Sequence, residues 1–307
     1  MASDHVYRDV CGLHMSYIFQ EPVLKEALAY KPKPGDVFVV SFPKSGSTWM
    51  QYIVYAIYHD GSKPENLREF LQKSPFLEAQ GLKAVENMPR PGAIKTHLPF
   101  NCIPYSPQAK YIFVARNPYD CCVSFYHHTR TLPAYHFADG SFEKFLGLFL
   151  EGKVDYGDYF DHLLSWYNHA RDENVLLVTY EELKGHPSAG VIKIADFLGY
   201  KYGNKLRKQP EVLGRILDTI SVKTMMELNG QLRRYTKEVA LAGEYKLLND
   251  KAADLMKPRT GDFVRKAIVG DWKNHFNADQ IAQMKERIAL KIQESTVMSL
   301  WADVDLP

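Results

Sequence analysis

Four apolar runs recur along the chain, and stretches with helical character follow or separate them. The runs cover residues 37–42, 93–97, 111–115 and 175–180. The runs VFVVSF and YIFVA are almost continuously apolar, as expected for strands that are buried on both faces of a sheet. Helices are predicted at 47–58, from Pro118 onward and at 190–198, with two more near 141–151 and 156–171.

This alternation predicts the fold class. Strands that alternate with helices form a parallel sheet with helices on both faces, an α/β architecture. No internal repeat, low-complexity segment or long linker divides the chain, so residues 1–307 are expected to form a single domain. Ligands of such sheets bind at the carboxyl ends of the strands, and the candidate functional residues lie directly after the apolar runs.

Composition and charge exclude several classes of protein. The chain is 46% hydrophobic and 24% charged, enough to build a core without disulfides or metals. A net charge of +2 is too small to indicate nucleic acid or a membrane surface as a partner. The four cysteines lack zinc-site spacing and are expected to be reduced. No signal peptide, membrane span or glycosylation sequon is visible, so we expect a soluble cytoplasmic protein.

The segment after the first strand has the features of a phosphate-binding loop. It runs from Ser41 to Trp49 as SFPKSGSTW and leads into the first predicted helix. Small residues let backbone N–H groups converge on an anion, the helix N-terminus adds a favourable dipole, and Lys44 supplies a charge. The loop has only Gly46 and its lysine precedes that glycine, so it differs from the nucleotide P-loop. The alternative is a helix with an ordinary Ser/Thr cap.

A second anion site is predicted where the strand YIFVA ends. Arg116 follows the strand, Asn117 and Pro118 open a helix, and Ser124 lies about two turns further on. A guanidinium fork and a hydroxyl suit a phosphate. A P-loop nucleoside triphosphatase would carry an Mg²⁺-binding carboxylate near this point, so no metal is expected. The alternative pairs Arg116 with a surface carboxylate. Arg265 and Lys266, which precede GDWK, are further candidates for the same site.

The candidate base is His97, at the end of the second strand in KTHLP. A histidine there can take a proton from a hydroxyl acceptor near neutral pH. Lys95 points to the same face because side chains alternate along a strand, and its charge would stabilise a developing negative charge. Most of the 11 histidines have no comparable context.

Taken together, these segments resemble the cytosolic sulfotransferases. The resemblance rests on PKSGSTW from Pro43, KTHLP from Lys95, RNP from Arg116 with Ser124, and RKxxxGDWK from Arg265, in this order and spacing. It extends from about residue 30 to residue 276. It implies transfer of a sulfuryl group from 3′-phosphoadenosine 5′-phosphosulfate (PAPS) to a small acceptor, without a metal and with adenosine 3′,5′-bisphosphate (PAP) as product.

The resemblance also implies roles for individual residues. His97 would be the general base, Lys44 would contact the bridging oxygen, and Lys95 would contact the sulfuryl group. The donor nucleotide would be held by the loop and by residues of four later segments: Lys44, Ser45, Gly46, Ser47, Thr48, Trp49, Arg116, Ser124, Tyr180, Ser221, Arg265 and Lys266. Alignment and electrostatic stabilisation would supply most of the rate.

The sequence departs from the family pattern at several positions. Ser47 replaces a usual threonine, and Val222 stands where the family has an aromatic partner for adenine. Ala267 replaces a usual glycine, and an unusual backbone angle there would strain alanine. The family's dimer motif, KxxxTVxxxE, would begin at Lys273 but meets Asn277, Ala278 and Ala282, so the usual dimer is not predicted.

By the same resemblance, the acceptor pocket would include Phe76, His128 and Tyr156. Aromatic walls favour a planar phenol, catechol or phenolic amine, and a steroid or aliphatic alcohol is the second expectation. No acidic residue can be assigned to an amine. Competing interpretations are an ATP-dependent small-molecule kinase and a nucleotide-binding protein without catalysis. A Golgi carbohydrate sulfotransferase would need a signal anchor, which we do not find.

Overall fold

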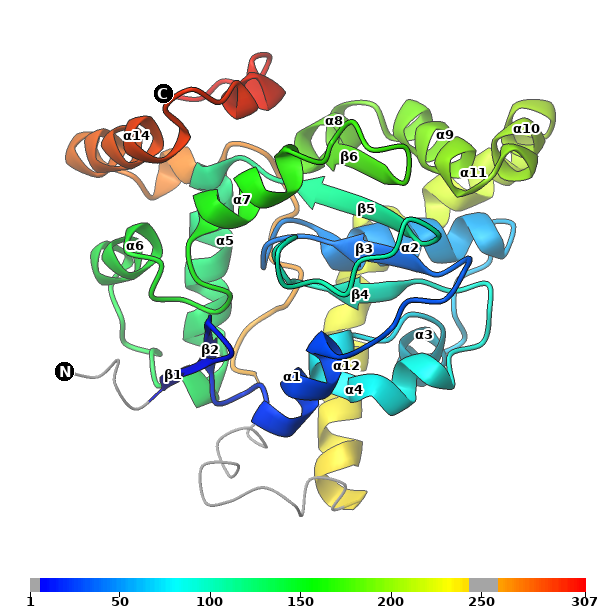
Figure 1. Ribbon diagram of the computed structural model, residues 1–307, viewed down its shortest axis with the longest axis horizontal. Helices are drawn as coiled ribbons and strands as arrows, with labels where there is room; N and C mark the ends of the chain where they lie inside the picture. Colours follow the sequence, from blue (N-terminus) through cyan, green and yellow to red (C-terminus); the bar gives the residue numbers. More distant parts are fainter. Residues whose placement is uncertain (1–5, 243–258) are drawn as a thin grey trace.

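The central element of the computed structural model is a four-stranded parallel sheet. The structure describes residues 6–242 and 259–307. The strands are β3 (Val37–Val40), β4 (Ile94–Thr96), β5 (Lys110–Ala115) and β6 (Val175–Thr179), in the order β4-β3-β5-β6. Figure 1 shows this sheet at the centre of the molecule. The four apolar runs therefore form the predicted strands, and no end is shifted by more than two residues.

Alternating side chains of the strands supply two hydrophobic cores, one on each face of the sheet. Val37 and Val39 of β3 belong to one core, whereas Phe38 and Val40 belong to the other. This alternation is the two-residue period of a strand, and it explains why the runs are apolar at every position. The predicted α/β architecture with helices on both faces is confirmed.

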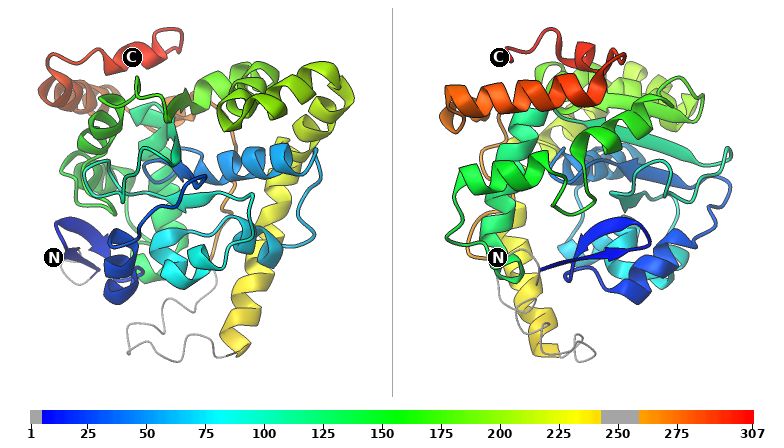
Figure 2. Two further views of the ribbon diagram at one scale, coloured as in Figure 1. Left: turned by 45° about the vertical axis from the view of Figure 1, so that its right-hand side comes forward. Right: turned by 60° about the vertical axis from the view of Figure 1, so that its left-hand side comes forward.

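Helices that follow β3 and β6 along the chain cover the core that contains Val37 and Val39. These are α2 (Ser47–Tyr58), α8 (Tyr180–Gly185), α9 (Pro187–Leu198), α10 (Tyr200–Lys208), α11 (Pro210–Thr219) and α12 (Val222–Ala242). The long helix α12, yellow in Figure 2, runs past the sheet along one side of the molecule. Helix α3 (Leu67–Lys73) adds Leu67 and Phe70 to the same core.

The second core lies beneath α1 (Glu21–Leu28), α4 (Leu77–Glu86), α5 (Pro118–Thr131), α6 (Phe142–Leu150), α7 (Tyr159–Tyr167) and α14 (Ala278–Ile292). An antiparallel hairpin of β1 (Tyr7–Val10) and β2 (Leu13–Ser16) packs at its edge. Three short 3₁₀ helices complete the described elements, at Pro133–Tyr135, Asp271–Asn274 and Val297–Trp301.

Two residues that depart from the family's dimer motif, Asn277 and Ala278, form the start of a helix in this structure. The Asn277 side chain accepts a hydrogen bond from Gln280 N, and Gln280 reciprocates to the Asn277 backbone, which caps α14. Ala278 is the first residue of that helix. Asn277 therefore starts a helix at the position where the family motif carries threonine.

Candidate functional site

A cavity of about 350 Å³ opens where the four parallel strands end. Most of the residues predicted from the sequence line it, although they come from distant parts of the chain. They are Lys44, Gly46, Ser47, Thr48, Trp49, Phe76, Lys95, His97, Arg116, Ser124, His128, Tyr156, Tyr180, Arg265 and Lys266.

Two of the predicted nucleotide contacts do not line this cavity. Ser45 is buried, and its hydroxyl lies 3.7 Å from the Cys121 thiol. The Ser221 hydroxyl accepts a hydrogen bond from Thr224 N at 3.3 Å, at the start of α12. The side chains of both residues are therefore engaged within the protein, and neither hydroxyl faces the cavity.

The loop between β3 and α2 has the backbone geometry of a tight anion-binding turn. Lys44 and Gly46 both have positive φ, 69° and 107°, and Gly46 is the N-cap of α2. A Cβ at residue 46 would lie 2.9 Å from the Tyr180 ring. Glycine is therefore required here by backbone conformation and by packing, and the start of α2 is left open toward the cavity.

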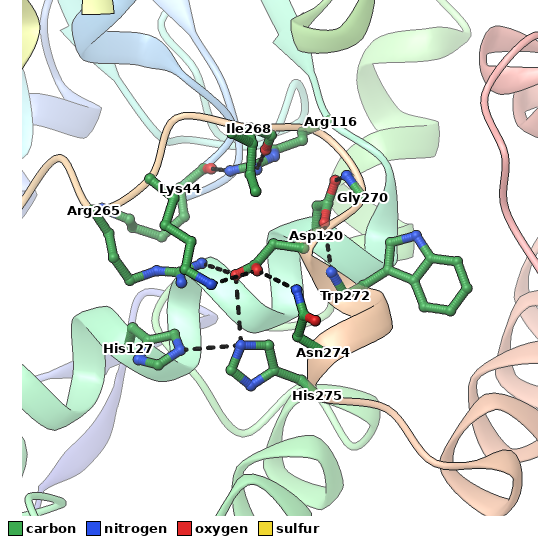
Figure 3. A network of polar contacts seen from close by, with 12 residues as sticks. Lys44, Arg116, Asp120, His127, Arg265, Ile268, Gly270, Trp272, Asn274 and His275 are labelled. Carbon is green, nitrogen blue, oxygen red and sulfur yellow. Dashed lines mark hydrogen bonds and ion pairs between the residues drawn. The ribbon is translucent and has the colours of Figure 1, made fainter. Parts of the chain in front are cut away.

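Arg116 holds two sides of the cavity together, and it is buried rather than paired with a surface carboxylate. Its guanidinium donates to the carbonyl oxygens of Lys44 at 3.3 Å and Ile268 at 3.1 Å, as Figure 3 shows. Its Cζ lies 4.4 Å from the centre of the Tyr180 ring. The Nε atom is buried without a hydrogen-bond partner. An additional acceptor at this position would satisfy that donor.

Two further cations, Lys44 and Lys95, line the cavity, and no carboxylate of the described residues is bonded to either. The Lys44 Nζ lies 4.1 Å from the Phe263 ring centre, and the Lys95 Nζ lies 4.3 Å from that of Phe76. Burial, followed by the charges of Arg259, Lys95 and Arg116, lowers the pKa of Lys44 well below its usual value. Burial also lowers the pKa of Lys95, to about 8. Mutual repulsion of this kind is relieved by a bound anion, so the site fits a phosphosulfate.

Arg265 and Lys266 also line the cavity, and they share one carboxylate. Asp271 accepts from Arg265 at 2.5 Å and from Lys266 at 2.7 Å, and it also receives Asn274 at 2.9 Å. Burial by itself would raise the pKa of Asp271. The hydrogen bonds, of which the one from Lys266 has the largest effect, outweigh burial and lower this pKa. Asp271 therefore stays ionised and holds both cations close to the cavity.

The segment that carries these cations is fixed to α5. Asp120 accepts from Gly270 N at 2.7 Å and from Trp272 N at 3.0 Å, which Figure 3 shows beside the pair His127 and His275. Ala267 has a φ of 55°, the left-handed conformation that was expected to strain alanine. The predicted departure from the family pattern therefore lies at a strained backbone position.

His97 is oriented by the loop that precedes Lys44. Its Nδ1 lies 2.6 Å from the Ser41 carbonyl oxygen, which can only accept, so Nδ1 carries the proton and Nε2 has the free lone pair. Burial, followed by the charge of Lys95, lowers the pKa of His97 well below its usual value. The Glu78 carboxylate accepts from His97 N at 2.6 Å and fixes the end of β4. The ring is therefore neutral at physiological pH.

Aromatic rings surround His97 on the side away from Lys44. Phe76 and Tyr156 meet its ring edge-to-face, with centroid distances of 5.1 and 5.4 Å. Phe19, which follows the β1–β2 hairpin, packs edge-to-face on both of these rings. This arrangement suits a flat apolar group beside the imidazole.

The end of the cavity beside α2 and α8 has aromatic walls on one side. Trp49 and Tyr180 meet at a centroid distance of 5.4 Å, and Trp49 Nε1 donates to the Ile220 carbonyl at 2.9 Å. Val222, 37% exposed, lines the cavity at the start of α12. No aromatic side chain stands at residue 222, as the sequence showed, and that wall is aliphatic.

Several lining residues were not predicted from the sequence, notably Phe19, Tyr135, Lys184, Arg259 and Phe263. None of these follows a parallel strand directly, and no motif includes them. Lys184 lies on α8, the short helix after β6, and this position was the one signal that could have suggested it. The others reach the cavity only through tertiary packing.

Comparisons with known proteins agree with this geometry. Residues 34–296 match the sulfotransferase domain family. Mouse sulfotransferase 1 family member D1 is 31% identical over 279 residues, 88% of this chain and 87% of the relative. Human sulfotransferase 1E1 is 32% identical over the same length and the same shares. The structure of mouse sulfotransferase SULT7A1 complexed with PAP has a TM-score of 0.73 and 26% identity, covering 97% of this chain and 98% of that one.

The chain therefore belongs to the sulfotransferase family, and the resemblance inferred from its motifs is confirmed. It is an enzyme of the PAPS-dependent sulfotransferase class, which sets aside the kinase alternative. Within residues 6–242 and 259–307, no cluster of three or more His, Cys, Asp or Glu side chains could hold a metal ion. None of the helices described is both long and apolar enough to cross a membrane.

Proposed function

We propose that this chain transfers the sulfuryl group of PAPS to the hydroxyl of a small aromatic acceptor by in-line displacement. The acceptor oxygen forms a bond to sulfur while the bond from sulfur to the bridging phosphate oxygen breaks. His97 receives the acceptor proton, and PAP leaves with the electron pair of the broken bond. The steps need no redox partner.

The orientation of His97 is the observation that carries the proposal. A general base needs a free lone pair that can reach the reacting hydroxyl. Because Nδ1 of His97 donates to the Ser41 carbonyl, Nε2 keeps such a lone pair. The low pKa keeps the ring unprotonated, so the base is available at neutral pH. The edge-on rings of Phe76 and Tyr156 beside it suit an aromatic ring whose hydroxyl points at the imidazole.

The donor would be held by the cations that line the cavity. Lys44 would bind the bridging oxygen as charge develops on it, and Lys95 would contact the sulfuryl group. Arg116 and Ser124 would bind the 3′-phosphate, together with Arg265 and Lys266. The bound PAP in the related mouse SULT7A1 supports the same nucleotide for this chain.

The walls of the pocket support the proposed acceptor class. Phe19, Phe76 and Tyr156 form an edge-to-face cluster, which favours a phenol or catechol, with or without an amine substituent, over a flexible aliphatic alcohol. His128 adds a polar group to this pocket.

The decisive test is His97→Ala. We expect kcat with PAPS and a simple phenol to fall about a thousandfold, because general base catalysis of this kind contributes roughly 10²–10⁴-fold. Thermal stabilisation by PAP should persist, since His97 does not hold the nucleotide. His186→Ala, at an exposed position between α8 and α9 that does not line the cavity, is the matched control. Near-normal kcat in His97→Ala would refute the base, and stabilisation by Mg-ATP but not PAP would refute the donor.

A further inference from the structure

Two histidines of the cavity, His97 and His128, carry the proton of the neutral ring on different nitrogen atoms. The Nδ1 of His97 donates to a carbonyl, which leaves its Nε2 as an acceptor. The Nδ1 of His128 lies 3.2 Å from Nη2 of Arg259. Arginine can only donate, so Nδ1 of His128 is the acceptor and the proton of the neutral ring is on Nε2. At Nε2, the neutral His128 ring therefore offers an N–H donor, whereas the His97 ring offers a lone pair that can accept a proton.

Burial keeps His128 in this neutral form. Burial first, then the charges of Lys44 and Arg259, lowers its pKa well below the usual value. Its ring lies among aromatic groups, 6.1 Å from Tyr135 and 6.2 Å from Phe263 by ring centres. His128 is thus a hydrogen-bond donor within the aromatic part of the cavity.

Arg259 brings a largely buried positive charge to the same place. Its Nη2 also donates to Thr131 Oγ1 at 2.6 Å, and its Cζ lies 5.3 Å from the Phe263 ring centre. Its Nε is buried without a partner. No carboxylate of the described residues forms a hydrogen bond or ion pair with it, although Asp262 is close enough to act through its charge. A buried cation of this kind is costly until an anion joins it.

Two carboxylates also line the cavity, Asp155 and Asp262, and Asp155 is already hydrogen-bonded. Asp155 accepts from Ser16 N at 2.5 Å and from Ser16 Oγ at 3.1 Å, and Tyr135 OH donates to it as well. These donors tie the β1–β2 hairpin to the loop before α7. Asp155 is therefore less able than Arg259 to bind a charged ligand group, which disfavours an amine at this end.

Arg259 is not among the proposed ligands of the donor, although its charge acts on Lys44. The phosphosulfate and the 3′-phosphate have Lys44, Arg116, Arg265 and Lys266 among the proposed ligands, together with the start of α2. Arg259 instead contacts His128 and Thr131 on the last turns of α5, among the rings that form the acceptor end.

We propose that Arg259 and His128 form a carboxylate subsite in the acceptor pocket, so that the preferred acceptor is a phenol with an acidic substituent. This inference rests on the proposed function and narrows its acceptor class. The phenolic hydroxyl lies at His97, and the carboxylate receives hydrogen bonds from the guanidinium of Arg259 and from Nε2–H of His128.

The test compares three ligands that share one ring: 3-(4-hydroxyphenyl)propionate, its primary amide and tyramine. Their dissociation constants are measured by calorimetry on the PAP-saturated enzyme, and kcat/KM is measured with PAPS. The acid should bind at least about tenfold more tightly than the amide, because hydrogen bonds to charged groups are among the strong ones. Tyramine should bind more weakly than the amide.

Variants of Arg259 connect the preference to the residue. Arg259→Gln should reduce the acid-to-amide ratio to within about threefold of one, and Arg259→Lys should retain part of it, because the charge stays while the fork is lost. His128→Phe should lower the ratio to a smaller extent. Arg68→Gln, an exposed arginine on α3, makes the same chemical change away from the cavity and should keep the wild-type ratio.

The outcomes separate the inference from the function it rests on. An acid-to-amide ratio of one or less in the wild type, or a preference that survives Arg259→Gln in a variant that PAP still stabilises, would overturn the subsite. A preference for tyramine would overturn the subsite and point to a cavity carboxylate, Asp155 or Asp262, instead. Absence of PAP stabilisation in the wild type would refute the donor site, and the binding ratio would then be measured on the free protein.

Discussion

The two ends of the cavity are built in different ways. The proposed donor end consists of backbone and side chains that lie directly after strands β3 and β5 and at the first turns of α2 and α5, joined by the segment that contains Arg265. The proposed acceptor end consists of side chains that follow the β1–β2 hairpin or precede α4, and of side chains from the last turns of α5, the loop before α7 and the segment that begins at Arg259.

This difference has a functional consequence. A phosphosulfate has the same shape and charge in every enzyme that uses it, and the ends of adjacent parallel strands position its ligands with little freedom. The acceptor end is free to vary, because a change at His128 or Arg259 alters the pocket without moving the phosphate loop. Substitutions at the donor end should therefore affect nucleotide binding most, and those at the acceptor end should affect selectivity.

The largest expected effect at the donor end is that of Arg116→Gln. It removes the cation that faces the proposed 3′-phosphate and loosens the contacts to Lys44 O and Ile268 O. PAP affinity should fall by about 2 kcal/mol, roughly 30-fold, by calorimetry. Arg171→Gln, at an exposed position, serves as the control. Unchanged affinity would mean that Arg116 supports only the fold.

The second effect is on the pH profile. Burial lowers the pKa of Lys95 to about 8, so its ammonium is charged below that pH and is lost as pH rises through it. We expect kcat/KM for PAPS, which reports on the free enzyme, to fall toward tenfold per pH unit above about pH 8. The arginine of Lys95→Arg stays charged at high pH. The pH above which kcat/KM falls should therefore be higher in this variant, even if its maximal kcat/KM is lower. An identical limb in the variant would assign the ionisation to another group.

A smaller effect is expected at the adenine wall. Val222→Phe places an aromatic ring opposite Trp49 and Tyr180, where the family carries one. PAP should bind roughly fivefold more tightly, about 1 kcal/mol, through ring contacts. Met226→Phe, at an exposed position on the same helix, should leave the affinity unchanged. Weaker binding in Val222→Phe would show that the aliphatic wall fits the nucleotide as it is.

The smallest effect concerns strain between the donor cations and α5. Ala267 has a φ of 55°, which costs an alanine about 1–2 kcal/mol, whereas glycine loses about 0.5–1 kcal/mol more conformational freedom on folding. Ala267→Gly should therefore raise the free energy of unfolding by about 0.5–1 kcal/mol in urea. Ala289→Gly, exposed within α14, should lower it by about 1 kcal/mol. A loss in Ala267→Gly would mean that the methyl group packs usefully.

The sequence by itself determined the parallel sheet and the donor end. A strand that is apolar at every position must be buried on both faces, and residues directly after adjacent parallel strands must meet at one edge. Lys44, His97 and Arg116 could therefore be brought together without coordinates. The hydroxyls of Ser45 and Ser221 show the limit of this reasoning, because a motif gives the position of a residue but not the direction of its side chain.

Only the tertiary structure decided the acceptor end. Phe19 and Arg259 are 240 positions apart, and no periodicity or spacing relates them. They line one cavity because the hairpin and the segment that begins at Arg259 both pack around α5 and its flanking loops. The ring nitrogen that carries the proton was likewise fixed in each histidine by a neighbour distant in sequence, Ser41 for His97 and Arg259 for His128. Hydrogen-bond partners of this kind depend on packing, which local sequence does not encode.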